Sequence, residues 1–472
     1  MKLNHLLNHS RREAEPIIES TARVKLEKHT PLFTGEENMS KKIVKFSFVV
    51  IAIAVITSLI AGCTPVPAAT PEPATEVPVV ATEAPTATVE PVTLNVWIMD
   101  RVGADAMETV KQVVEQWAAE TGNTVVVTEG NQFEMLGKLV EAMPAGEGPD
   151  IFMNLNNYIG GHYAGQLIVP LESYLSEEEL AKYSQTALDS FTLDGHLLGV
   201  PFAADTYALV YNKDLVPTPP ATMDELIEMS KTLTTGDQYG FLYPIDNFYY
   251  SYAFTSAYGA YIFKWTGSGY DVNDIGLASA GAIEGLTYVK DLVAKENLMP
   301  VDTTYDVMNS LFTEGKVGMI IASPGMVPAF KAAGINIGVA KIPTTPNGAD
   351  PKPFATYTGF SVSAYSQHQD VAADLAVYLG SNLPLPLYQA NPGNIPVYLP
   401  VASDPSLQSD EELAGWVSQL AICDVLPSIN EMNFVWGPAS TAFQAAVHGN
   451  ETVEKSLTDA QALIAQSIAE NK

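Results

Sequence analysis

From residue 92 onward the chain alternates β-rich stretches with stretches of helical periodicity, and this order restricts the possible folds most. VTLNVWIM at 92–99 follows a proline, apolar residues then recur at helical spacing over 110–117, and NTVVVTE follows at 123–129. These three stretches form a unit of βαβ length. We expect Asp105 and Glu108 to form an N-cap pair for the helix and Gly122 to end it.

The same alternation continues along the chain. Residues 134–143 and a Thr222/Glu225-capped stretch are predicted helices, and further predicted strands begin at Ile151 and lie at 197–203, 208–214, 318–323 and 337–343. Strands that alternate with helices predict an α/β fold with a mostly parallel sheet covered on both faces. A body of about 380 residues exceeds one comfortable core, so we expect two lobes.

A leader precedes this body. Residues 39–63 read MSKKIVKFSFVVIAIAVITSLIAGC, in which lysines are followed by a short apolar run and small residues before Cys63. The run is short for a membrane-spanning helix and typical of a secretory signal. It resembles a bacterial lipoprotein signal at 39–62, which implies that Cys63 is lipidated. The alternative is an ordinary signal peptide with an incidental cysteine. We interpret residues 1–38 as an extension upstream of the true start, Met39.

The linker at 63–91 joins Cys63 to the body. It contains seven prolines and four glutamates but no basic residue. Such a segment buries too little apolar surface to fold, and its prolines keep it extended. We therefore expect a body held by the lipid on Cys63 at the outer face of the cell membrane, on the periplasmic side if an outer membrane exists.

Charge narrows the range of partners. The chain has 24 basic and 54 acidic residues, and without residues 1–62 it has 15 and 48, a formal net charge of −33. Nucleic acid and anionic membrane surfaces repel such a protein, so neither is an expected partner.

Motifs for chemistry are few. The body contains no G-x-S-x-G, P-loop or G-x-G-x-x-G motif, and its four histidines lie at no metal-binding spacing. We predict no catalytic residue, no cofactor and no metal site, and a core position for Cys423. A glycosidase pair of carboxylates stays open, because sequence alone cannot show which carboxylates face each other across a cleft.

Two local features point to binding. Aromatic residues cluster over 248–265, where packing in the core is the ordinary explanation. Arg101 is the only arginine after the leader and follows the first strand, where open α/β sheets bind ligands. A solvated surface arginine is the alternative.

The body resembles the maltose/maltodextrin-binding proteins of bacterial ABC importers, extracellular solute-binding proteins of family 1. The matching stretches are LNVWI at 94–98, GEGPDI at 146–151, GG at 160–161, YNKDLVPTPP at 211–220, YDVNDIG at 270–276 and SLTDAQ at 456–461. The resemblance implies a type II periplasmic-binding-protein fold with hinge-linked lobes and a cleft between them. It places the N-terminal lobe at 92–203 plus 360–405 and the C-terminal lobe at 208–354 plus 410–472. The chain would cross between lobes near 203–208, 354–360 and 403–411.

The resemblance also implies binding residues. Trp436 falls at a sugar-stacking tryptophan, Tyr249 at a tyrosine near the sugar, and Asp205 at an acidic sugar-binding position. This suits a sugar, whose flat C–H faces pack on aromatic rings and whose hydroxyls bond to fixed polar groups.

Other family positions differ. Asn154 and Gly325 replace stacking tryptophans, and Asn247 replaces a cleft glutamate. The remaining replacements are Asn157-Tyr158 for an acid–arginine pair and Arg101-Val102 for an acid–lysine pair. The carboxamides favour a neutral, hydroxyl-rich ligand, whereas Arg101 would suit an acidic sugar; ordinary turn chemistry is the alternative for the asparagines. The expected ligand-binding set is therefore Trp436, Tyr249, Asp205, Arg101, Asn154, Asn157, Tyr158 and Asn247.

We therefore expect a monomeric, lipid-anchored protein that captures a carbohydrate, delivers it to an ABC permease and catalyses no reaction. Hinge closure on the ligand would be its mechanism. Two alternatives remain: the same fold with a peptide, polyamine or metal ion as cargo, and a surface-anchored glycoside hydrolase.

Overall fold

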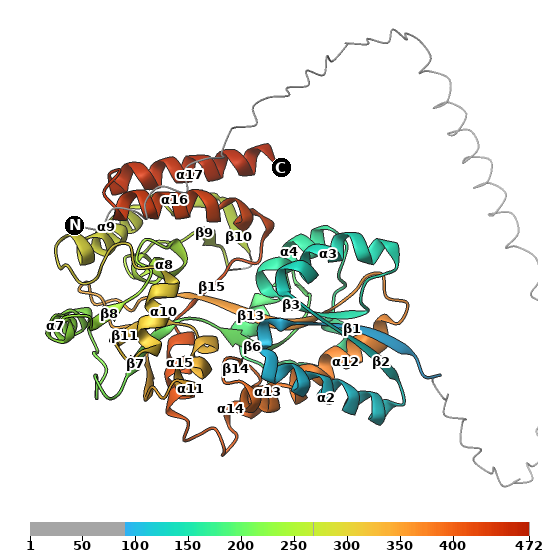
Figure 1. The fold of residues 1–472 in the computed structure, drawn as a ribbon. Helices are drawn as coiled ribbons and strands as arrows, with labels where there is room; N and C mark the ends of the chain where they lie inside the picture. Colours follow the sequence, from blue (N-terminus) through green and yellow to red (C-terminus); the bar gives the residue numbers. More distant parts are fainter. Residues whose placement is uncertain (1–89, 268, 472) are drawn as a thin grey trace, which may run out of the picture. The chain divides into compact units, whose positions relative to one another are not determined.

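The computed structural model describes residues 90–267 and 269–471 (Figure 1). The predictions for the upstream extension at 1–38, the signal at 39–62, Cys63 and all but the last two residues of the linker 63–91 lie outside the described residues.

Two mixed sheets form the body. The larger has the order β14-β6-β13-β3-β1-β2, with β15 pairing with β13, and the smaller has the order β12-β7-β11-β8. The strands of the larger sheet are β1 (Thr93–Met99), β2 (Thr124–Gly130), β3 (Ile151–Leu155), β6 (Val200–Asp205), β13 (Phe354–Val362), β14 (Ile395–Pro396) and β15 (Asp424–Val425). Those of the smaller sheet are β7 (Ala208–Asn212), β8 (Tyr239–Leu242), β11 (Val317–Ala322) and β12 (Ile337–Ala340). Two hairpins pair β4 (Thr192–Leu193) with β5 (His196–Leu197) and β9 (Phe263–Trp265) with β10 (Tyr270–Ile275).

Helices pack around both sheets (Figure 1). They are α2 (Ala104–Thr121), α3 (Gln132–Ala145), α4 (Ile159–Ala164), α5 (Glu177–Leu180), α6 (Gln185–Ser190), α7 (Met223–Leu233), α8 (Phe248–Ser256), α9 (Ala280–Ala294), α10 (Tyr305–Thr313), α11 (Val327–Ala332), α12 (Gln369–Asn382), α13 (Pro384–Ala390), α14 (Leu399–Ala402), α15 (Glu411–Leu420), α16 (Trp436–Val447) and α17 (Val453–Glu470). Every residue of β3, β11 and β13 is buried, as expected for strands that are covered on both faces.

The expectation of a mostly parallel sheet is wrong. β1 runs parallel to β2 and β3, but β13 runs antiparallel to both β3 and β6, and β7 runs antiparallel to β11 and β12. Alternating strands and helices predict parallel strands only where a crossover helix returns the chain to the same sheet. β7 follows β6 of the other sheet and β13 follows β12 of the other sheet, so neither is placed by a βαβ crossover.

Helix ends follow local chemistry in two of three predicted cases. Gly122 ends α2 in the left-handed conformation, with φ of 76°, and Thr222 and Glu225 form a complete capping box at the start of α7. The Asp105–Glu108 cap is wrong, because α2 begins at Ala104 and Gly103 occupies the N-cap position without a side-chain hydrogen bond.

Three chain segments meet where the sheets join. The chain leaves β6 at Asp205 and enters β7 at Ala208. Between them, Thr206 donates from Oγ1 to the carbonyl of Phe354 at 2.9 Å, and its Oγ1 lies 3.0 Å from Sγ of Cys423. β15 then pairs with the first residues of β13. We call these segments, 205–208, 353–355 and 423–425, the junction. The lobe boundaries predicted above stay a prediction.

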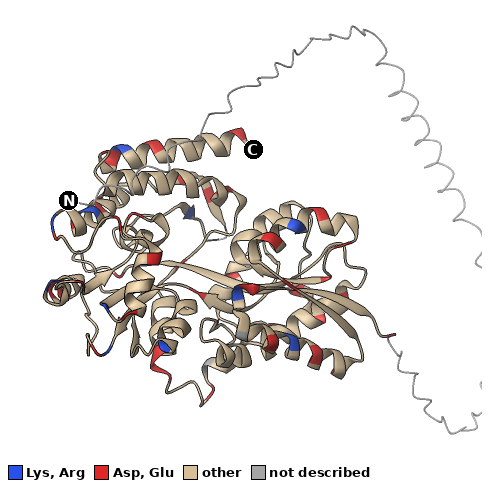
Figure 2. Ribbon diagram, in the orientation of Figure 1, with Lys and Arg blue, Asp and Glu red and all other residues tan. Residues whose placement is uncertain are grey.

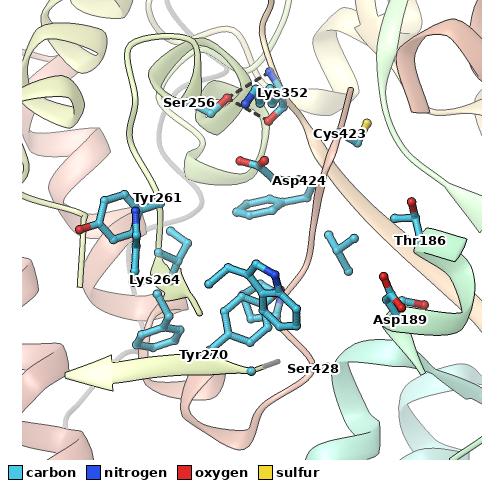
Figure 3. A pocket seen from close by; sticks show the side chains of 18 of the residues that line it. Thr186, Asp189, Ser256, Tyr261, Lys264, Tyr270, Lys352, Cys423, Asp424 and Ser428 are labelled. Carbon is cyan, nitrogen blue, oxygen red and sulfur yellow. Dashed lines mark hydrogen bonds between the residues drawn. The ribbon is translucent and has the colours of Figure 1, made fainter. Parts of the chain in front are cut away.

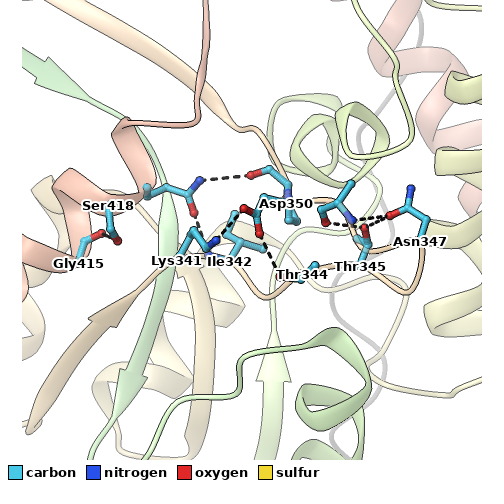
Figure 4. A network of polar contacts seen from close by, with 11 residues as sticks. Lys341, Ile342, Thr344, Thr345, Asn347, Asp350, Gly415 and Ser418 are labelled. Carbon is cyan, nitrogen blue, oxygen red and sulfur yellow. Dashed lines mark hydrogen bonds and ion pairs between the residues drawn. The ribbon is translucent and has the colours of Figure 1, made fainter.

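A polar network fixes the loop that leads into β13 (Figure 4). Asp350 accepts from Lys341 Nζ at 2.7 Å and from Thr344 Oγ1 at 3.0 Å. The fully buried Gln419 of α15 accepts from the Ile342 N–H at 2.8 Å and donates to the Pro351 carbonyl at 3.3 Å. Because α15 packs on β12, this network ties the entry of the junction to the smaller sheet.

Acidic residues are spread over many helices instead of gathering on one element (Figure 2). Among the described helices, none combines the length and the apolar character that crossing a membrane requires.

The capping box of α7 yields a stability prediction. Thr222→Ala leaves the Glu225 N–H without its side-chain acceptor, so we expect a loss of about 1 kcal/mol in the free energy of unfolding. Urea denaturation followed by circular dichroism measures this loss. Thr232→Ala, in the same helix, is the control: Thr232 is exposed and bonds only its own helix backbone, so a change smaller than 0.5 kcal/mol, roughly that of ordinary surface substitutions, is expected. Equal losses in both variants would contradict the capping role.

Candidate functional site

Arg101 and Asp205 form an ion pair beside the junction. Arg101 lies in the 3-10 turn η1 (Asp100–Val102) directly after β1, and Asp205 ends β6. Nη2 of Arg101 lies 3.0 Å from Oδ2 of Asp205, and its Nε donates to Oγ1 of Thr358 on β13 at 3.2 Å. Two fixed acceptors therefore hold the guanidinium, and the alternative of a free, solvated arginine does not apply.

Asp205 is shielded from water on one side. Burial raises the pKa of its carboxyl group, and the charge of Arg101 opposes this shift. Oδ2 has Arg101 as its partner, whereas Oδ1 is buried and has no hydrogen-bond partner among the described residues. A buried acceptor without a partner costs roughly 1–3 kcal/mol, which a hydroxyl donor from a ligand would recover.

Tyr249 and Trp436 provide aromatic surface next to this ion pair. Tyr249 lies in the first turn of α8 and Trp436 begins α16, and their ring centroids are 6.4 Å apart. Phe354 packs against both rings, at 6.0 and 6.2 Å. Burial and the nearby charge of Asp205 raise the pKa of Tyr249 far above its usual value, so its hydroxyl stays protonated. We call Arg101, Asp205, Tyr249 and Trp436 the Arg–Trp cluster.

Of the other four predicted binding residues, Asn247 bonds to the backbone of Tyr249 in the cluster. Among the described residues, no hydrogen bond or ring contact joins Asn154, Asn157 or Tyr158 to the cluster. Asn154 is fully buried in β3. Its Nδ2 donates to Ser361 Oγ and lies 3.1 Å from Nδ1 of His162, and its Oδ1 accepts from the Leu155 N–H. Its amide is thus saturated inside the protein and offers nothing to a ligand in this conformation.

Asn157, Tyr158 and Asn247 have different surroundings. Asn157 and Tyr158 lie in the turn η2 (Asn156–Tyr158) after β3, where Tyr158 stacks on His162 with ring centroids 6.0 Å apart. Oδ1 of Asn157, like Oδ1 of Asp205, is buried without a partner in the described part of the chain. Asn247 is exposed and caps α8 by accepting from the Tyr249 N–H at 2.9 Å. It therefore shows the turn chemistry considered above and holds Tyr249 in place.

Sequence reasoning missed the residues that support the cluster. Thr358 holds the Arg101 side chain, and Tyr207 donates to the Tyr249 carbonyl. Phe354 forms the wall behind both aromatic rings. No local motif marks these residues, because each acquires its role through a contact between distant segments.

Phe354 also lines a cavity of about 570 Å³ (Figure 3), and none of the four cluster residues belongs to this lining. Its aromatic lining is Tyr252, Tyr261, Phe263, Trp265, Tyr270 and Phe354. Packing in the core is the expected role of most aromatic residues in the 248–265 stretch, and Tyr252 and Phe263 are indeed buried. Trp265 is not, with 49% of its surface exposed.

The histidines and Cys423 have ordinary surroundings. Cys423 bonds to the Gln419 carbonyl at 3.3 Å, and burial raises the pKa of its thiol to about 12. His196 pairs with Glu172 and His448 with Asp246. Within 90–267 and 269–471, no three or more His, Cys, Asp and Glu side chains gather in a way that would hold a metal ion.

Residues 102–382 match the family model described as bacterial extracellular solute-binding protein. The chain belongs to this family. It is 31% identical to the galactooligosaccharide-binding protein of Bacillus subtilis (strain 168) over 358 residues, which are 74% of this chain and 84% of that protein. It is 28% identical over 371 residues to a maltooligosaccharide ABC transporter solute-binding lipoprotein of Streptococcus pneumoniae (strain ATCC BAA-255 / R6), covering 76% and 86% of the two chains.

A solved structure extends the likeness to three dimensions. A cyclo/maltodextrin-binding protein complexed with maltotetraose superposes with a TM-score of 0.75 at 31% identity, covering 80% of this chain and 98% of that one. The two-lobed α/β fold of a solute-binding protein is therefore confirmed, as is the resemblance recognised in the sequence. Members of this family are extracellular, and the relatives named here are binding proteins.

The buried His162 yields a prediction for stability against pH. Burial lowers the pKa of its imidazole to about 4, well below the usual value of about 6.5, so the unfolded chain binds a proton that the folded chain rejects. The contribution of His162 to the free energy of unfolding is therefore fully present above about pH 6.5 and is lost as the pH falls toward 4. The expected loss is roughly 2–3 kcal/mol near pH 4.5. Denaturant titrations of wild type and His162→Gln at the two ends of this range should show a smaller acid loss in the variant. The exposed His368→Gln is the control, and a loss in His162→Gln as large as in wild type would contradict the assignment.

Proposed function

We propose that this solute-binding protein captures a neutral oligosaccharide at the Arg–Trp cluster and passes it to an ABC permease. The observation that carries the proposal is the combination of an aromatic surface, Tyr249 and Trp436, with a charge-compensated carboxylate, Asp205. Aromatic faces beside polar groups suit the C–H faces and hydroxyls of a pyranose. The names of the relatives, which refer to galactooligosaccharide, maltooligosaccharide and maltodextrin, support this ligand class.

The ion pair favours a neutral ligand over an acidic sugar. Arg101 is already compensated by Asp205 at 3.0 Å, so a ligand carboxylate near Arg101 would meet the negative charge of Asp205 as well. The two buried oxygens without partners, on Asp205 and Asn157, are acceptors that require donors. Hydroxyl groups supply such donors at neutral pH and carboxylates do not.

The same geometry favours binding over catalysis. Glycoside hydrolysis ordinarily requires two carboxyl groups on either side of the scissile bond, one of them to protonate the leaving oxygen. Of the four cluster residues only Asp205 carries a carboxylate, and Arg101 occupies one of its oxygens. The alternative function, a glycoside hydrolase, therefore lacks a second carboxylate among the four cluster residues.

Three further parts of the proposal concern assembly. We expect a lipid on Cys63 to hold the protein at the membrane, in keeping with the lipoprotein name of the streptococcal relative. The ligand would bridge the predicted lobes, so that closure around the junction traps it. A monomer would then deliver the cargo to the transmembrane subunits of the permease.

The aromatic surface is tested by removing Trp436. Trp436→Ala should weaken binding of maltotriose or a galactooligosaccharide by roughly 1–3 kcal/mol, which is about 5- to 150-fold in the dissociation constant. Isothermal titration calorimetry at the high-affinity site measures the change. Trp265→Ala is the matched control, because Trp265 lies outside the cluster and should leave this affinity unaltered. Unchanged affinity in Trp436→Ala would remove Trp436 from the site.

Ligand charge is tested by a thermal-shift panel. Neutral oligosaccharides at about a hundred times their dissociation constant should add ~2.7 kcal/mol of stability, whereas uronic acids, amino acids and polyamines should add none. Arg101→Gln should weaken binding of the neutral sugar, because this substitution leaves Asp205 charged and without its ion-pair partner. A thermal shift with uronic acids alone would contradict the proposal of a neutral ligand. It would indicate that the charge of Arg101 is available to a ligand carboxylate.

A further inference from the structure

We infer that the cavity lined by Trp265, Tyr270, Tyr252 and Asp424 is a second binding site for a neutral saccharide unit, separate from the Arg–Trp cluster. Its volume of about 570 Å³ lies within the usual range for small-molecule sites. Figure 3 shows rings, hydroxyls and charged groups from several chain segments around this cavity. No residue of the cluster belongs to its lining.

One wall is an aromatic platform on the β9–β10 hairpin. Trp265 and Tyr270 are direct cross-strand partners, and their rings meet edge to face with centroids 4.9 Å apart. Trp265 is nevertheless 49% exposed, although both its ring and that of Tyr270 line the cavity. A tryptophan held by its neighbour with one face open provides rigid stacking surface at low entropic cost.

The opposite wall holds a fixed acceptor. Tyr252 donates to Oδ2 of Asp424 at 2.7 Å, and its ring stacks on Phe354 with centroids 3.9 Å apart and planes 9° from parallel. The bond from Tyr252 engages Oδ2 and leaves Oδ1 of Asp424, a residue of the cavity lining, for another donor. This oxygen is a preorganised acceptor for a hydroxyl pair, as carboxylates are in polar ligand sites.

The charges of the lining cancel. Lys264 and Lys352 face Asp189 and Asp424 around the cavity, so two cations stand against two anions. Lys264 is itself engaged, with Nζ 5.3 Å from the ring centroid of Tyr261. A balanced site of this kind gains little from a net ligand charge, whereas hydroxyls can both donate to Asp424 and accept from the lysines.

The two sites share a wall but not their binding groups. Phe354 contacts Tyr249 and Trp436 of the cluster and also lines the cavity, and Cys423 beside it bonds to Thr206 next to Asp205. A single sugar ring bound in the cavity would thus leave the cluster residues free to bind a ligand of their own. The inference therefore stands apart from the function proposed for the cluster.

The experiment is isothermal titration calorimetry of the purified full chain with maltose, maltotriose and a galactooligosaccharide. Wild type should show two classes of site. Trp265→Ala should weaken the cavity class about tenfold or more and spare the other class, and Trp436→Ala should do the reverse. Tyr252→Phe, which keeps the ring stack and removes the bond to Asp424, should also weaken only the cavity class. Circular dichroism verifies that each variant is folded.

Each outcome decides between the assignments. One class of site that Trp436→Ala weakens and Trp265→Ala spares would overturn the cavity inference and leave the proposed function intact. One class of site that Trp265→Ala weakens and Trp436→Ala spares would make the cavity the main binding site. It would overturn the inference that the cavity is a second site, and also the proposal that the ligand binds at the cluster. Wild type could also show two classes of site of which neither is weakened by Trp265→Ala or Tyr252→Phe. This result would place the second site outside the cavity and overturn the inference.

Discussion

The junction is the constraint on which the rest of the structure depends. One hydroxyl, Oγ1 of Thr206, bonds to the carbonyl of Phe354 and contacts the thiol of Cys423, and so joins three segments that are distant in sequence. Asp205 precedes Thr206, and the Phe354 ring supports Tyr249 and Trp436. The positions of both the ion pair and the aromatic surface therefore follow from how these few residues cross between the two sheets.

Charge compensation within the cluster is the basis of the proposed preference for a neutral ligand. Within residues 90–471 the only arginine is Arg101, and it is paired with a carboxylate whose pKa burial raises. Separating two such charges from water is costly, and the hydrogen bond from the guanidinium to Thr358 offsets part of this cost. What the pair offers to a ligand is a dipole with one unoccupied oxygen. A ligand with several weak dipoles of its own, such as a neutral sugar, complements it better than an ion does.

Features that depend on neighbouring residues could be predicted from the sequence. The capping box of Thr222 and Glu225 and the left-handed stop at Gly122 are decided within one helical turn, and the strands at β1, β2 and β11 follow from local composition. The direction of β13 could not be predicted in this way, because it depends on which sheet the chain has just left. Asn154 shows the same limit at the site: its position matched a binding position in the family, but His162 and Ser361 engage its amide in the core.

The cavity shows why an aromatic-rich stretch is hard to interpret from sequence. In α8, Tyr249 and Tyr252 are three residues apart and so lie near one face of the helix, yet they serve different places. Tyr249 packs toward Trp436, whereas Tyr252 stacks on Phe354 and bonds to Asp424. Phe354 thus contacts both sets of rings. The cluster and the cavity therefore share this one residue, at the start of the strand that enters the larger sheet, although they share no ligand-binding group.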